Sequence, residues 1–146
     1  MDKKYSKRVR YEFIFKSGEE FQYQIDMDPD TLEHPVPVGL PPEWAKLDVD
    51  KCSICPLKSS VTEYCPLALR IAPILSFAPH PAFESVQIRV HKDNMTIESY
   101  TTVQDAYRSL IGLIMATSGC PHTGFFKPMA WFHLPFATQD ETLFRA

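Results

Sequence analysis

Four cysteines are the residues of this chain whose type and spacing point most directly to chemistry. They follow the pattern C-x2-C-x9-C-x54-C, and the last three are each followed by proline: Cys52, Cys55, Cys65 and Cys120. Two thiolates from one short loop, a third soon after it and a fourth from a distant segment suffice for one tetrahedral metal site. We therefore expect all four cysteines to be ligands of a single metal centre that links two parts of the chain.

The choice of metal rests on the residues around the thiols. Thiolates are soft ligands that suit either an iron–sulfur cluster or Zn²⁺. Zinc loops commonly carry a glycine after the Cys pair, whereas Pro56 follows Cys55 here, and Cys-Pro pairs are typical of ferredoxin-type sequences. We favour a [4Fe–4S] cluster and keep Zn²⁺ as the alternative. His122 is a further candidate ligand, although an ordinary polar loop histidine is the simpler interpretation.

Other interpretations of the cysteines stay open. Buried free thiols can pack as small hydrophobic side chains, and disulfides would need an oxidising compartment. A thioredoxin-type Cys52–Cys55 dithiol would need a strand before it and a helix directly after it. Cys120 with His122 or His133 as its base is the one enzymatic arrangement we retain, because no phosphate loop or nucleophile elbow is present. We expect a protein without catalytic residues.

Length, charge and hydropathy argue against a nucleic-acid-binding protein and against a membrane protein. A chain of 146 residues fits one domain with its own core, and a net charge of -3 gives no reason to expect nucleic acid as a partner. No apolar run reaches the roughly 18 residues of a membrane helix, and no signal peptide is recognisable. We expect a cytoplasmic protein whose partner is another protein, not nucleic acid or a membrane.

The elements that must position the cysteines can be predicted from periodicity. Alternating apolar residues predict one hairpin over residues 8–27 and a second over 86–99. Residues 103–117 form the clearest amphipathic helix, so Cys120 follows directly after a well-anchored helix end. Thr102 and Gly119 are its expected N-terminal and C-terminal caps.

A shorter helix is predicted after the third cysteine. Pro66 suits its first position, the apolar stretch 67–72 continues it, and Pro73 ends or kinks it. A proline-rich connection over residues 28–43 precedes the cysteine loop and forms no regular element. We expect residues 43–47 to form a single helical turn that docks Trp44 on the core.

The C-terminal part of the chain is the least regular. Residues 125–136 are aromatic and irregular, and residues 138–141 resemble a capping box that starts another helix. That helix is either very short, or residues 1–146 are the front part of a longer protein. The ββαββα order predicts one α+β domain, a four-stranded antiparallel sheet with helices on one face.

Three cysteine blocks and one aromatic block stand out together. They are Cys52-Ser53-Ile54-Cys55-Pro56-Leu57, Tyr64-Cys65-Pro66-Leu67-Ala68, Thr117-Ser118-Gly119-Cys120-Pro121 and Phe132-His133-Leu134-Pro135-Phe136-Ala137-Thr138. With these blocks the chain resembles an uncharacterised bacterial protein family, a domain of unknown function, over most of its length. The resemblance implies that the cysteines form a unit and implies no activity. It also implies a helix beyond residue 146.

These observations predict a small metal-binding module with a four-cysteine centre. A [4Fe–4S] centre would serve electron transfer or redox sensing, whereas zinc would be structural. The alternative is a protein-interaction or scaffold domain that uses the exposed proline-rich and aromatic segments 36–44 and 125–136, with structural zinc or without metal.

Overall fold

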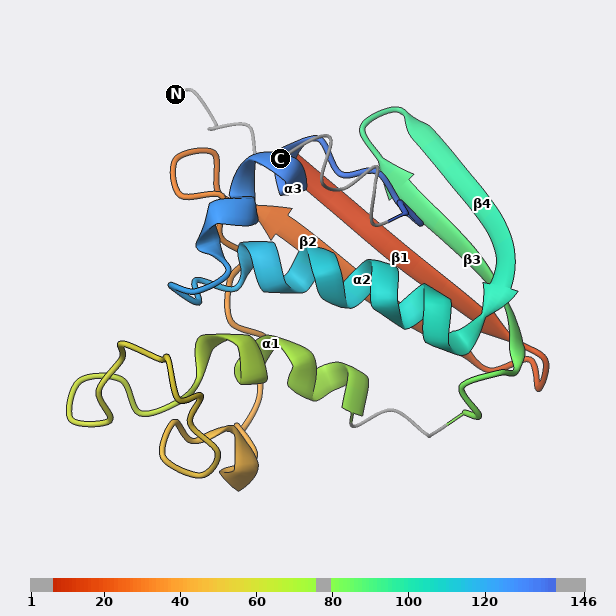
Figure 1. The fold of residues 1–146 in the computed structure, drawn as a ribbon. Coiled ribbons are helices and arrows are strands. Elements are labelled where there is room, and N and C mark those ends of the chain that lie inside the picture. Colours follow the sequence, from red (N-terminus) through yellow and green to blue (C-terminus); the bar gives the residue numbers. More distant parts are fainter. Residues whose placement is uncertain (1–6, 76–79, 139–146) are drawn as a thin grey trace.

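The computed structural model describes residues 7–75 and 80–138, which form a four-stranded antiparallel sheet with helices against one face (Figure 1). The strands lie in the order β2-β1-β3-β4. In chain order the elements are β1 (Lys7–Phe15), β2 (Glu20–Met27), η1 (Glu43–Ala45), α1 (Pro66–Leu75), β3 (Ser85–Lys92), β4 (Met95–Thr102), α2 (Val103–Thr117), η2 (Gly124–Phe126) and α3 (Lys127–Trp131). The predicted α+β fold and its ββαββα order are confirmed.

The core lies between the sheet and the helical layer. Successive side chains of a strand point to opposite faces, so every second residue of β1 faces the helices and is buried. The same holds for β2 and β3. The buried set that these strands share with α1, α2 and α3 includes Val9, Tyr11, Phe13, Ile25, Ile88, Val90, Ile74, Leu110, Ile114 and Ala130. The opposite face of β1 carries polar residues such as Arg10 and Glu12.

The long helix α2 begins and ends where its caps predict. The Thr102 hydroxyl accepts a hydrogen bond from the Asp105 backbone N–H at 3.2 Å, which satisfies one of the amides left unpaired at a helix start. Gly119 has φ +83°, the left-handed conformation that glycine adopts readily after a helix end. Both ends of α2 are therefore fixed by local sequence, and Cys120 follows at a defined place.

Three local predictions differ from the structure. Residues 43–45 do form one turn, but Trp44 is 44% exposed, and Ala45 and Leu47 are the residues buried there. Helix α1 continues past Pro73 to Leu75. The stretch predicted to be irregular contains η2 and α3, because a proline in the first helical turn costs no intrahelical hydrogen bond. The helix expected from residue 138 onward falls on residues 139–146, outside the described part.

Candidate functional site

The first two cysteines lie in an exposed loop that is closed at its base. The backbone N–H of Cys55 donates to the carbonyl of Cys52 at 3.0 Å, so one tight turn carries both thiols. At the base of the loop, Leu47 N–H donates to Glu63 O at 2.9 Å, and Lys46 pairs with Tyr64 as an antiparallel bridge. Cys52 is exposed and Cys55 is half-buried.

Cys65 joins this loop to the start of α1. Its backbone N–H donates to Ala45 O at 2.8 Å, and its carbonyl accepts from Leu69 N–H at 3.0 Å, the first hydrogen bond of the helix. Cys65 therefore stands at the N-terminal end of α1, where the partial positive charge of the helix favours a thiolate. Pro66 occupies the first helical position, as predicted.

Cys120 is held in a short turn after α2. Its N–H donates to the Ser118 hydroxyl at 3.2 Å, and its carbonyl accepts from Thr123 N–H at 3.2 Å. The Thr123 hydroxyl also donates to Met115 O at 2.7 Å, which ties the turn back to α2. The half-buried thiol of Cys120 is thus placed on a stable segment.

Backbone and side-chain hydrogen bonds bring the start of α1 and the end of α2 to the same end of the molecule. The His34 N–H donates to Thr117 O at 2.8 Å, three residues before Cys120. Arg70 Nε donates to His34 O at 2.8 Å, and Arg70 Nη1 donates to Pro66 O at 2.9 Å, one residue after Cys65. Figure 1 shows the yellow cysteine loop and the blue turn after α2 at this same end.

Arg70 is a buried cation within this arrangement. It is only 7% exposed, and its hydrogen bonds go to backbone carbonyls. Burial lowers the pKa of Arg70, while the charges of Glu33 and Tyr23 act in the opposite direction. Within residues 7–75 and 80–138 no carboxylate forms an ion pair with Arg70; Glu33, whose charge acts on it, pairs with Lys127 at 3.0 Å. A buried guanidinium without an anionic partner is costly.

The cysteine loop and the turn after α2 lie at one end of the molecule, but the thiols that they carry do not form a completed site. Among the described residues, no group of three or more His, Cys, Asp or Glu side chains is placed to hold a metal ion. All four cysteines are free thiols. The prediction that Cys52, Cys55, Cys65 and Cys120 bind one metal centre therefore stays a prediction.

The alternative interpretations of the cysteines gain little from these surroundings. None of the four thiols belongs to the buried hydrophobic core, so packing as small apolar side chains does not account for them. The Cys52–Cys55 turn has no strand directly before it and no helix directly after it, which a thioredoxin-type dithiol would need. His122 is exposed.

A second polar network joins residues that are far apart in the sequence, and the sequence patterns did not predict it. The buried hydroxyl of Tyr11 lies 2.8 Å from Ser109 Oγ and 2.5 Å from His133 Nε2. Ser109 Oγ also accepts from Phe136 N–H at 3.0 Å, and the Lys92 ammonium donates to His133 O. Burial raises the pKa of Tyr11, against a smaller opposing effect of Ser109. This network attaches residues 133–136 to the sheet and to α2.

Signals for the missed residues were present but weak. Arg70 interrupts an otherwise apolar stretch, which marks it as unusual without indicating that it is buried. His133 stands within an aromatic run and is buried, as a core histidine would be. Its contact with Tyr11 joins residues 122 positions apart, which no local pattern predicts.

A comparison with protein-family models gives one match, which covers residues 9–146 and is described as a domain of unknown function (DUF6901). The search of curated proteins and the search of solved structures each gave no match. Within the described residues, none of the helices has the length and apolar character needed to cross a membrane.

Proposed function

Because the chain belongs to the DUF6901 family, a domain of unknown function, we propose a function from its own residues: it is a metal-binding module whose four cysteines hold one centre. The ligands would be Cys52, Cys55, Cys65 and Cys120. As in the sequence analysis, a [4Fe–4S] cluster is the favoured centre and Zn²⁺ the alternative.

The observation that carries this proposal is the buried Arg70 between the start of α1 and the end of α2. Four thiolates around Zn²⁺ or a [4Fe–4S] cluster have a net negative charge. A nearby buried guanidinium, together with the N-terminal end of α1, would stabilise that charge. Arg70 forms no ion pair with a carboxylate in the described part of the chain, so an anionic centre would add to the partial compensation that the charge of Glu33 gives its burial.

Metal binding would have to close the loop that carries Cys52 and Cys55. Residues 48–62 are fixed mainly at their base, through Leu47 and Tyr64. The free energy of metal binding can fold a segment that is incompletely packed without the metal. We therefore expect the loop to move toward Cys65 and Cys120 when metal binds.

The identity of the centre decides what the module does. A [4Fe–4S] cluster would supply one-electron chemistry for electron transfer or redox sensing. Zinc would serve only to hold the loop in place, and the module would then act by docking to a partner protein.

The deciding experiment is metal and acid-labile sulfide analysis of untagged protein purified without oxygen. About four iron atoms and four sulfides per chain with a brown colour would support the cluster. One zinc per chain in a colourless solution would support the structural site. No metal after purification, and no uptake of Zn²⁺ or Co²⁺ by the reduced protein, would refute the proposal.

Variants separate metal binding from a general loss of structure. Cys120→Ser and Cys52→Ser should each lower the metal content and the melting temperature, whereas Ser60→Ala in the same exposed loop should change neither. Amide hydrogen exchange should show protection of residues 48–62 on addition of metal. An unchanged metal content in Cys120→Ser would remove this residue from the site and refute the four-cysteine centre.

A second candidate function, protein interaction, is favoured by a specific observation. Among the residues that the structure describes, half of the large hydrophobic side chains that are exposed lie between residues 36 and 61: Val36, Val38, Leu40, Trp44, Val49, Ile54 and Val61. Exposed apolar side chains gathered in one part of a chain favour a contact surface. Val38→Ser with Leu40→Ser should abolish a partner contact and leave the metal content unchanged, which distinguishes this function from metal binding.

A further inference from the structure

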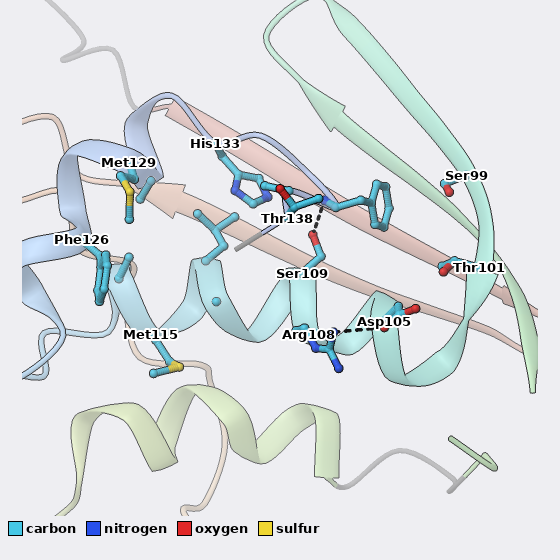
Figure 2. Close-up of a pocket in the computed structure, with 16 residues that line it drawn as sticks. Ser99, Thr101, Asp105, Arg108, Ser109, Met115, Phe126, Met129, His133 and Thr138 are labelled. Atoms are coloured by element: carbon cyan, nitrogen blue, oxygen red, sulfur yellow. Dashed lines mark hydrogen bonds and ion pairs between the residues drawn. The ribbon is translucent and has the colours of Figure 1, made fainter. Parts of the chain in front are cut away.

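A pocket of about 890 Å³ lies between α2, β4 and residues 133–138, and none of the four cysteines lines it (Figure 2). Its volume is within the range of small-molecule sites, roughly 300–1,000 Å³. Apolar side chains from three elements line it, among them Leu113, Phe126 and Met129. The proposed metal centre does not use this pocket, so it requires a separate explanation.

Gly112 is exposed and lies on the open side of this pocket. It lies in the middle of α2, where glycine destabilises a helix by about 1 kcal/mol relative to alanine. A Cβ atom built at Gly112 meets no atom of the described residues within 4 Å, so close packing does not account for the glycine. The pocket therefore extends to the backbone of α2 at this position.

The polar groups of the pocket are mainly uncharged. Hydroxyls come from Ser99 and Thr101 on β4, which point toward the pocket in Figure 2. The Ser109 hydroxyl and the His133 ring also line it, but both are already hydrogen-bonded to Tyr11. The charged pair at one end, Arg108 and Asp105, is closed on itself at 3.4 Å, and both side chains are largely exposed. Both charges of this pair therefore face water and each other, and neither is a buried partner for an ionic ligand.

From this lining we propose that the pocket binds an uncharged small molecule with an apolar body and a hydroxyl or carbonyl group. The apolar body would lie along Gly112, Leu113 and Phe126, and its polar group would meet the hydroxyls of Ser99 and Thr101. A carboxylate or an ammonium group would lose hydration without a compensating partner and would bind more weakly.

Three probes of equal chain length test this inference: 1-octanol, octanoate and octylammonium. In amide NMR titrations of the full chain, 1-octanol should shift signals of α2, β4 and residues 133–138 and bind at least about tenfold more tightly than either ion. Equal affinity for the three probes, shifts confined to other parts of the molecule, or no binding of 1-octanol would overturn the proposal.

Two substitutions at one position provide the matched variant and control. Gly112→Leu should obstruct the open side of the pocket and weaken 1-octanol binding at least about tenfold. Gly112→Ala should bind like the unsubstituted protein and melt at a higher temperature, because alanine favours the helix. If Gly112→Leu instead lowers the melting temperature below that of the unsubstituted protein, the space is filled by the protein's own chain and the inference fails.

Discussion

Removing the Tyr11 hydroxyl should destabilise the protein more than removing the Tyr23 hydroxyl. Tyr11→Phe keeps the buried ring and deletes two contacts, with Ser109 Oγ at 2.8 Å and His133 Nε2 at 2.5 Å. A typical hydrogen bond contributes about 1 kcal/mol, and a buried partner left without one costs about 1–3 kcal/mol. We therefore expect the free energy of unfolding to fall by about 2–3 kcal/mol.

Tyr23→Phe is the matched control for this substitution. The Tyr23 hydroxyl donates to Arg70 O at 2.6 Å. This carbonyl lies within α1, so it also accepts the helical hydrogen bond from the N–H four residues later and keeps a partner when the hydroxyl is removed. Its loss should cost only about 1 kcal/mol. Both rings stay in place, so the difference between the two variants isolates the hydroxyl network.

Urea unfolding followed by far-UV circular dichroism measures both variants. An unchanged slope against urea concentration would show that only stability has changed. In a chain of this size the Tyr11→Phe loss corresponds to a decrease in melting temperature of about 5–10 °C. A cost below about 0.5 kcal/mol, or one equal to that of Tyr23→Phe, would contradict the reasoning.

Other predictions concern titration and backbone conformation. Burial, together with the nearby charge of Arg70, lowers the pKa of His34. The unfolded chain therefore binds a proton more readily at this residue, and the free energy of unfolding should fall as the pH drops below about 6.5. His34→Asn, measured by melting temperature between pH 5 and pH 8, should remove this acid-side loss; an unchanged profile would exclude His34 as its source. Burial raises the pKa of Tyr23 to about 12, above the usual value near 10, so stability should fall between pH 10 and pH 12, less steeply in Tyr23→Phe. A profile as steep in that variant would contradict the assignment. Gly119→Ala and Gly18→Ala should each cost about 1–2 kcal/mol in urea unfolding, because both glycines have φ near +85°. A neutral result at Gly119 would show that the turn before Cys120 adapts.

Sequence reasoning succeeded where the determinants are local. The alternation of β1 and β2 and the caps of α2 are each decided within a few residues, and the structure confirms them. The pairing of β1 with β2 and of β3 with β4 follows, because antiparallel neighbours need only short connections.

Long-range features could not be predicted in this way. The burial of Arg70 depends on a carbonyl 36 residues earlier, at His34. Trp44 was expected in the core, but the adjacent Ala45 and Leu47 occupy the buried positions, so the larger side chain is left outside. The cysteine spacing indicated a common site, and hydrogen bonds do bring the start of α1 and the end of α2 together. Spacing cannot determine how far the loop that carries Cys52 and Cys55 must move to reach the other two thiols.

The strand order has a consequence for how the chain can be divided. The first hairpin and the second meet through β1 and β3, which pair along seven positions from Val9–Lys92 to Phe15–Val86. The exposed cysteine loop lies outside the sheet and between these two hairpins in the sequence. A single peptide-bond cleavage in residues 48–62 would therefore yield two fragments that share one continuous sheet. We expect such fragments to reassociate through the β1–β3 pairing, so each half could carry its own isotope label or chemical modification.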